Sequence, residues 1–366
     1  MDVLSEANRL SALGKPVISM AVGQPSDPAP KSVLEAARRA LESGRLGYTD
    51  ALGIDALRKR IAWFYQEHYG VSVNPARIAV TTGSSSGFNL AFLAMFDAGD
   101  RVAITRPGYP AYRNIMTALG IEVVEIPTGP GEGSQMSALL EDVHRARPLK
   151  GLLFASPANP TGAVMRAEEL KQVILTAESL GISVISDEIY HRLSHVGLDV
   201  TALSISDNVT IINSFSKYYC MTGWRIGWMV LPQTLVRPVE RIAQSLYISP
   251  PELSQIAAVQ AFSGTEELEA VKARYGESRL LVMDRLPRLG LKLAAPMDGA
   301  FYAWCDVSQH TADSMEFAKK MLAETFVAAT PGHDFDPVNG HRFMRFSYAG
   351  APSDIAEALD RIENWL

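Results

Sequence analysis

The sequence predicts an α/β protein with a mostly parallel seven-stranded sheet covered by helices and a smaller α+β domain beside it. Its 366 residues are enough for about two domains. Between residues 77 and 230, short apolar runs alternate with helix-length segments, a pattern typical of a parallel sheet with right-handed crossovers. The C-terminal third differs, because a long helical segment precedes shorter strands and helices. We therefore expect a large domain at residues 29–255 and a small domain formed by residues 1–28 and 256–366.

Seven runs between residues 77 and 230 are predicted to be strands. Most of them are apolar throughout, as strands covered on both faces are. They are Ile78–Thr82, Arg101–Thr105, Glu122–Ile126, Gly151–Ala155, Ser183–Asp187, Thr210–Ser214 and Arg225–Val230. The segments predicted to be helical between them are Ser86–Phe96, Ala111–Leu119 and Glu168–Leu180. The glycine-rich run at 129–133 is predicted to be a loop without a helix at the place a dinucleotide-binding motif requires.

The C-terminal third is predicted to mix helices with short strands. A helical region is expected from Pro251 to about Leu289, followed by two strands around the Asp298–Gly299 turn. The remaining elements are expected at Ser314–Thr325 (helix), Phe326–Thr330 and Arg342–Ser347 (strands), and from Ser353 onward (helix).

Composition excludes several classes of protein. Hydrophobic residues make up 47% and charged residues 20%, which argues against a disordered chain. The net charge of −6 gives no general basic field for nucleic acid or an anionic membrane. Two cysteines do not make a disulfide scaffold, and neither the N-terminal residues nor the polar-centred run at 78–96 reads as a signal peptide or a membrane span. A cytoplasmic protein is predicted.

Polar residues follow the predicted strands at their carboxyl ends, where open α/β sheets bind ligands. Ser84 and Ser85 open a helix after the first strand, which suits either an anion site or an ordinary helix cap. Asn159 lies in the Pro-rich turn SPANPTG, which could equally be a plain loop. Asp187 ends a strand with Tyr190 three residues later, where a helix cap is the alternative.

The segment after the strand Thr210–Ser214 carries the most chemistry. Ser216 and Lys217 follow that strand, and Arg225 lies eight residues beyond the lysine. A lysine at the end of a buried strand is costly unless it is paired or used covalently. Together with the residues after the other strands, this set supplies an amine for a Schiff base, an anion for a pyridinium nitrogen, donors for a phenolate oxygen and a phosphate site. Those are the requirements of pyridoxal 5′-phosphate (PLP).

The segments SPANPTG, SDEIY, SFSKYYCMTGWRIGW and MRFSYA resemble the motifs of the class I/II (fold-type I) PLP-dependent aminotransferases. The similarity runs in order from Gly23 to Arg345, which is most of the chain, and the lysine segment is its most specific part. The resemblance implies the PLP-transferase fold of type I. It also implies transfer of the amino group of an L-amino acid to a 2-oxo acid by a ping-pong mechanism.

The resemblance further implies the roles of the cofactor-binding residues. Lys217 would form the internal aldimine and move a proton, and Asp187 would pair with the ring nitrogen. Asn159 and Tyr190 would hydrogen-bond the O3′ oxygen, which makes Tyr190 a catalytic candidate with Lys217 and Asp187. Tyr109 would stack on the ring. The phosphate would be held by Ser84, Ser85, Ser216 and Arg225, with Ser214 as a further cofactor-binding candidate.

Substrate and partner contacts are implied in the same way. Arg345 would grip the substrate α-carboxylate, with Gly23 and Asn159 lining the same corner. Tyr48 would reach the cofactor phosphate of a neighbouring subunit, so a homodimer is expected, with few contacts from the short segment before Gly23. The Asn159–Pro160 bond is expected to be cis, as it is in the family.

Alternatives remain open at this point. The same site residues fit a PLP-dependent carbon–sulfur β-lyase acting on cysteine conjugates. An effector domain of a transcription regulator is disfavoured, because residues 1–22 cannot hold a DNA-binding domain. No metal site is expected, since His191 and His195 flank Arg192 where the HExxH motif has its glutamate. No second arginine for a dicarboxylate side chain is identified, which favours neutral or aromatic substrates.

Overall fold

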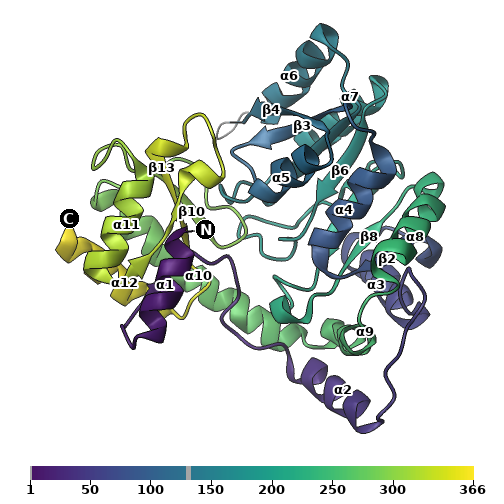
Figure 1. The fold of residues 1–366 in the computed structure, drawn as a ribbon, viewed down its shortest axis with the longest axis horizontal. Coiled ribbons are helices and arrows are strands. Elements are labelled where there is room, and N and C mark those ends of the chain that lie inside the picture. The colour runs from purple at the N-terminus through teal and green to yellow at the C-terminus, as the bar shows by residue number, and fades with distance from the viewer. Residues whose placement is uncertain (1, 129–132) are drawn as a thin grey trace.

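The computed structural model describes residues 2–128 and 133–366 (Figure 1). The largest sheet of this part of the chain has seven strands. The spatial order of these strands is β2-β8-β7-β6-β5-β3-β4. Five strands from β7 to β4 are parallel, whereas β8 is antiparallel to both of its neighbours. The strands are β2 (Ile78–Thr81), β3 (Arg101–Arg106), β4 (Glu122–Pro127), β5 (Gly151–Ala155), β6 (Ser183–Asp187), β7 (Thr210–Ser214) and β8 (Gly227–Val230).

Different helices cover the two faces of this sheet. Successive side chains of β5 point to opposite faces, so Leu153 packs in a cluster with Phe88 whereas Leu152 packs in a second cluster with Val173. The first cluster is formed with α4 (Gly83–Met95), α5 (Pro110–Ala118) and α8 (Gln233–Tyr247). The second is formed with α3 (Asp55–Tyr69), α6 (Gly133–Ala146) and α7 (Ala167–Ser179). Helices therefore cover both faces of the sheet, which is why most of its strands are largely apolar.

A second group of elements combines the N-terminus with the C-terminal third. One sheet has the order β12-β13-β10-β9, and β1 pairs in parallel with β11. Its strands are β1 (Ile18–Ser19), β9 (Lys292–Leu293), β10 (Tyr302–Asp306), β11 (Val327–Ala328), β12 (Thr330–Pro331) and β13 (Phe343–Ser347). Its helices are α1 (Asp2–Ala12), α11 (Ser314–Thr325) and α12 (Pro352–Trp365). In Figure 1 the long helix α10 (Thr265–Arg288) runs from this group toward α9 (Glu252–Val259), near which α2 (Lys31–Glu42) packs.

The predicted fold class is confirmed, and most strand bounds agree within one residue. The large and small domain boundaries at 28/29 and 255/256 stay a prediction. Within the described part of the chain, no helix is both long enough and apolar enough to cross a bilayer.

Two predicted element starts are wrong in ways that matter for the site. The strand predicted from Arg225 begins at Gly227, because Arg225 has a left-handed φ of 51° after the 3₁₀ turn Thr222–Trp224. The helix predicted from Ser86 begins at Gly83. Ser84 and Ser85 therefore lie in the first helical turn rather than before it.

Two further predictions need correction. The helical region predicted at 251–289 is divided, because a 3₁₀ turn at Ala261–Ser263 and Gly264 separate α9 from α10. The strand predicted at 326–330 is divided into β11 and β12, and Phe326, with a left-handed φ of 58°, ends α11 instead. The helix α6, which begins at Gly133, the last residue of the glycine-rich run, was not among the predicted elements. The predicted loop at 129–132 lies outside the described residues.

Candidate active site

Lys217 lies just beyond the carboxyl end of β7, as predicted. Its amine donates a hydrogen bond to the backbone carbonyl of Gly23 at 2.5 Å and lies 5.7 Å from the ring centre of Tyr190. Burial lowers the pKa of Lys217 to about 8, and the positive charge of Arg345 adds to this effect. A substantial fraction of the amine is therefore neutral near pH 8, which is the state that can attack a carbonyl carbon.

Asp187 ends β6 and is 3% exposed. One carboxylate oxygen accepts a hydrogen bond from the backbone N–H of Ile189 at 3.0 Å, and the other accepts one from the hydroxyl of Tyr112. Burial raises the pKa of Asp187 to about 6, although the hydrogen bond from Tyr112 opposes that rise. The carboxylate is thus held ionised at neutral pH in a dry setting, where it interacts strongly with a cation.

The start of α4 and Arg225 form a site suited to an anion. A Cβ atom added at Gly83 would lie 2.5 Å from Nη2 of Arg225, so the guanidinium lies directly over the first turn of the helix. A Cβ at Gly227 would lie 3.0 Å from the backbone nitrogen of Ser84. These two glycines therefore allow β8 and its preceding turn to approach the helix N-terminus. The space in front of the N-terminus of α4 is then lined by free backbone N–H groups and the guanidinium of Arg225. The positive end of the helix dipole adds to the attraction for an anion there.

Ser214 and Ser216 complete this end of the site. The Ser214 hydroxyl oxygen lies 2.9 Å from that of Ser216 and 3.0 Å from the carbonyl oxygen of Ile226, and it accepts the Ser216 N–H at 3.1 Å. Both serines are buried at the carboxyl end of β7. The hydrogen bonds fix the turn that presents Lys217.

Arg345 on β13 faces Asn159 from the other side of the site. Its Nη1 donates to Oδ1 of Asn159 at 2.8 Å, and its Nη2 donates to the carbonyl of Ala21 at 2.6 Å. Its Nε is buried and has no hydrogen-bond partner among the described residues. The predicted cis bond between Asn159 and Pro160 is confirmed. A fixed guanidinium with a spare buried donor is suited to a carboxylate.

Three tyrosines line the same region. The hydroxyl of Tyr190 lies 2.7 Å from that of Tyr302. Tyr109, at the start of α5, packs edge-on against Tyr112 with ring centres 5.4 Å apart, and burial raises its pKa. Because the charges of Asp187, Arg345 and Arg225 also act on the pKa of Tyr109, these groups share one site.

Tyr48 is the one predicted residue that this chain does not bring to the others. Its side chain is 82% exposed and forms no hydrogen bond or ring contact with any described residue. Its neighbours are held, because the N–H of Gly47 donates to a carboxylate oxygen of Glu252 at 2.6 Å and that of Thr49 to the hydroxyl of Ser249 at 3.2 Å. The side chain therefore projects outward from an anchored loop.

Sequence reasoning missed two residues of the site, Tyr112 and Tyr302. Both are buried, and their hydroxyls contact Asp187 and Tyr190, from which they are 75 and 112 positions away in the chain. Tyr112 could have been found from its spacing, since it lies three residues after Tyr109 on a predicted helix and so shares its face. Nothing local in the segment around Tyr302 indicates its contact.

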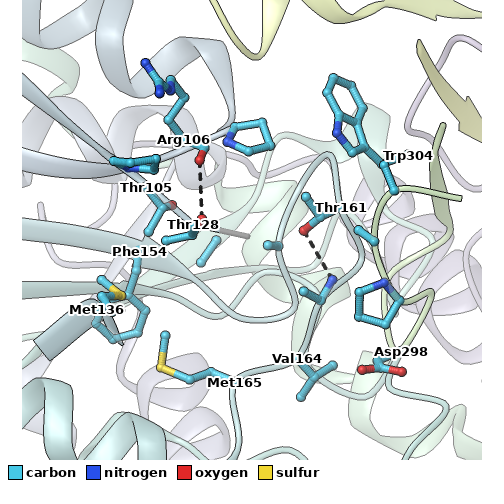
Figure 2. Close-up of a pocket in the computed structure, with 18 of the residues that line it drawn as sticks. Thr105, Arg106, Thr128, Met136, Phe154, Thr161, Val164, Met165, Asp298 and Trp304 are labelled. Carbon is cyan, nitrogen blue, oxygen red and sulfur yellow. Dashed lines mark hydrogen bonds between the residues drawn. The ribbon is translucent and has the colours of Figure 1, made fainter. Parts of the chain in front are cut away.

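A cavity of about 650 Å³ lies next to the site, between the large sheet and β10 (Figure 2). In Figure 2, Thr161, Val164 and Trp304 lie on one side of the cavity, and Thr105, Phe154 and Met136 lie on the other. Among the described residues, Lys217, Asp187 and Arg345 do not line it. Ala158 and Thr161, from the turn that carries Asn159, do line it.

Comparison with known proteins decides the family. The profile of the family "Aminotransferase class I and II" matches residues 15–362. The chain belongs to the class I and II aminotransferases. It is 49% identical to the valine–pyruvate aminotransferase of Mycobacterium tuberculosis, with 100% of this chain and 95% of that protein aligned.

Solved structures agree with this assignment. A crystal structure of an aminotransferase from M. tuberculosis superimposes with a TM-score of 0.96 at 48% identity, covering 100% of this chain and 95% of that one. The aspartate aminotransferase of Thermus thermophilus, solved with maleate, superimposes with a TM-score of 0.91 at 32% identity over 100% and 96% of the two chains. These relatives are fold-type I enzymes, so the chain is an aminotransferase of that fold, and the β-lyase alternative is not favoured.

Proposed function

We propose that this aminotransferase carries PLP on Lys217 and moves the amino group of an L-amino acid to a 2-oxo acid in two half-reactions. The observation that carries the proposal is the lysine itself: a buried amine with a pKa near 8 between an ionised carboxylate and two guanidinium groups. Enzymes of this family use PLP, which supplies an electron-accepting ring and a carbonyl for the amino group.

The residues of the chain fit this cofactor. Asp187 is buried where a protonated ring nitrogen would compensate its charge. The guanidinium of Arg225 lies so close over Gly83 that a Cβ there would come within 2.5 Å of it. The phosphate would be held there by the first turn of α4 together with Ser216 and Arg225. Lys217 would then hold and return the proton at the reacting carbon, because it is the one amine at the carboxyl end of β7. Tyr190 and Asn159 would hold the phenolic oxygen, and Tyr109 would cover the ring.

We propose an uncharged side chain for the amino acid substrate. The guanidinium carbon of Arg345 lies 4.7 Å from the ring centre of Phe335, which is itself buried. Within the described residues, the charged groups that act on the pKa of Lys217 are Arg345, Asp187 and Arg225. Arg106, an arginine that lines the neighbouring cavity, already pairs with Glu125 and Asp336. The similarity to a valine–pyruvate aminotransferase makes valine and pyruvate the first pair to test.

We also propose a homodimer in which Tyr48 reaches the cofactor phosphate of the partner. An exposed tyrosine on an anchored loop is suited to contact a second chain. The exposed apolar side chains of the same segment and of the region around Ser249 are Leu46, Leu246 and Ile248. Mixing Lys217→Ala chains with Tyr48→Ala chains should restore activity, since hybrid dimers contain one intact site, and no gain on mixing would refute the shared site.

The cytoplasm is the proposed location. The two cysteines, Cys220 and Cys305, are free and buried, so the fold uses no disulfide. Burial raises the pKa of Cys220 to about 12, which keeps the thiol protonated. Fractionation of cells followed by an activity assay tests this location.

The deciding experiment is a panel of half-reactions. The PLP-loaded protein is mixed with each amino acid, and the loss of the absorbance of the lysine-bound cofactor is followed. Valine and other uncharged amino acids should react faster than aspartate, and adding pyruvate should restore the original absorbance. Release of pyruvate and ammonia from a cysteine conjugate, without any requirement for an oxo acid, would instead indicate the β-lyase. Lys217→Ala is the control that should show no reaction.

A further inference from the structure

Tyr302, which is not among the predicted site residues, lies between Tyr190 and Arg345. It is the first residue of β10 and is 1% exposed. Its hydroxyl lies 2.7 Å from that of Tyr190, and its ring centre lies 4.3 Å from the guanidinium carbon of Arg345. One side chain therefore touches a residue proposed to contact the cofactor and the residue proposed to bind the substrate carboxylate.

The approach of Tyr302 depends on a glycine. A Cβ atom at Gly23 would lie 1.9 Å from the hydroxyl oxygen of Tyr302 and 2.9 Å from its Cζ, so any larger residue would displace the phenol. The carbonyl of the same glycine accepts the hydrogen bond of Lys217 at 2.5 Å. Tyr302 is thus packed against the backbone that also holds the reactive amine.

We propose that Tyr302 is a positioning residue whose hydroxyl acts on Tyr190 and whose ring acts on Arg345. The proposal deepens the proposed function and rests on it. The hydroxyl of Tyr190 has one hydrogen, so when that hydrogen is directed at the phenolic oxygen of the cofactor, Tyr302 must donate its own to the oxygen of Tyr190. This makes Tyr190 a better donor, because hydrogen bonds in a chain polarise one another.

The ring of Tyr302 has a separate effect. The face of an aromatic ring attracts a cation, and here the ring of Tyr302 lies against the guanidinium of Arg345. Hydrogen bonds from Arg345 to Asn159 and Ala21 hold the two ends of the same group. The guanidinium is therefore held in place before a carboxylate arrives, which reduces the cost of binding it.

Two variants separate these effects. Tyr302→Phe removes only the hydroxyl, and Tyr302→Leu removes the ring as well. The first readout is the pH at which the absorbance of the lysine-bound cofactor changes, measured without substrate. Without Tyr302, Tyr190 would be a weaker donor, so more negative charge would remain on the phenolic oxygen of the cofactor. That charge would favour the protonated form of the nitrogen that joins Lys217 to the cofactor. Both variants should therefore move this transition upward by about half a pH unit.

The second readout is KM for the amino acid. Tyr302→Phe keeps the ring over Arg345, so its KM should stay within about twofold of that of the parent protein while kcat falls about fivefold. Tyr302→Leu should in addition raise KM about fivefold, because the stacking on Arg345 is lost. If Tyr302 had only a structural role, both variants would lower the unfolding temperature. They would not show a shifted pH transition in both with a raised KM only in the variant that lacks the ring.

Tyr275→Phe is the matched control. Tyr275 is 1% exposed and its hydroxyl has no hydrogen-bond partner among the described residues, so its loss should change neither readout. If Tyr302→Leu does not fold, Tyr302→Met takes its place. An unchanged pH transition in Tyr302→Phe, or an unchanged KM in the variant without the ring, overturns the proposal. If the parent protein itself shows no lysine-bound cofactor, the proposed function fails instead, so the two failures are distinguishable.

Discussion

The two arginines of the site, Arg345 and Arg225, are held in opposite ways. Arg345 is 7% exposed, and its guanidinium is fixed by Asn159 and Ala21 and packed against aromatic rings. Arg225 is exposed, sits in a left-handed turn and donates to the carbonyl of Thr222 at 3.1 Å. The guanidinium of Arg345 is therefore fixed and shielded from water, whereas that of Arg225 is exposed to water and lies at the N-terminus of α4.

The different burial of the two arginines predicts different roles for the substrate end of the site, at Arg345, and the phosphate end, at Arg225. A buried guanidinium is already ordered and desolvated in the folded protein. A carboxylate that matches its geometry therefore binds strongly and specifically. An exposed guanidinium is screened by water and shares its anion with N–H groups and hydroxyls. We therefore expect Arg345 to bind the α-carboxylate of the substrate and Arg225 to strengthen cofactor retention as one donor among several.

Removal of Arg345 should have the largest effect. Arg345→Ala should lower kcat/KM for the amino acid roughly 100- to 1,000-fold, because a charge-assisted contact in a dry site is lost and the polar groups that held it lose a partner. Cofactor affinity should change little. Steady-state kinetics and cofactor titration measure the two quantities. Arg342→Ala is the control, since Arg342 lies just before β13 but its side chain is 50% exposed and pairs with Asp306; a similar loss there would contradict the role of Arg345.

The pH dependence of cofactor loading should come next in size. The neutral amine of Lys217 captures the aldehyde, and its pKa is lowered to about 8. Between pH 6 and pH 8 the neutral fraction, and with it the loading rate at fixed PLP, should rise about 50-fold and then level off above pH 8. Stopped-flow absorbance measures this rate in the cofactor-free protein.

The same pH profile distinguishes the two arginines. Arg345 lowers the pKa of Lys217 more than Arg225 does. Arg345→Ala should therefore move the midpoint of the loading profile further upward than Arg225→Ala. A midpoint at pH 10.5 or above in the parent protein, the ordinary pKa of a lysine, would mean that burial does not lower the lysine pKa.

Removal of Arg225 should have the smallest effect. Arg225→Ala should raise the dissociation constant for PLP about 10- to 30-fold, because Ser84, Ser85, Ser216 and the start of α4 still offer donors. At saturating PLP, kcat should return to near the parent value. Arg237→Ala serves as the control, since Arg237 is an exposed arginine that pairs with Glu240. A loss of kcat that PLP does not restore would show that Arg225 takes part beyond retention.

Most of the fold could be predicted because most strands of the large sheet are short, apolar runs that are largely buried. β5, β6 and β7 have the bounds that their apolar runs indicate, and the polar residue after each strand lies at one edge of the sheet. Prediction failed where backbone conformation, rather than hydrophobicity, ends an element. Arg225 and Phe326 both adopt a positive φ, which residue preference alone does not indicate.

The site could be predicted in part for a related reason. Lys217, Asp187 and Asn159 follow strands, so topology alone brings them together. Tyr112 and Tyr302 were missed because their roles depend on contacts across 75 and 112 positions of the chain. The burial of Arg345 and the exposure of Arg225 could not be predicted either, because burial depends on which elements pack over each residue.

The central claim is that Lys217 carries the cofactor, and reduction with borohydride followed by peptide mapping tests it most directly. Reduction fixes the bond between PLP and the amine that holds it, and mass spectrometry then locates the pyridoxyl group. We expect one modified residue, Lys217, and no stable modification in Lys217→Ala. A pyridoxyl group on any other lysine of the native protein would contradict it.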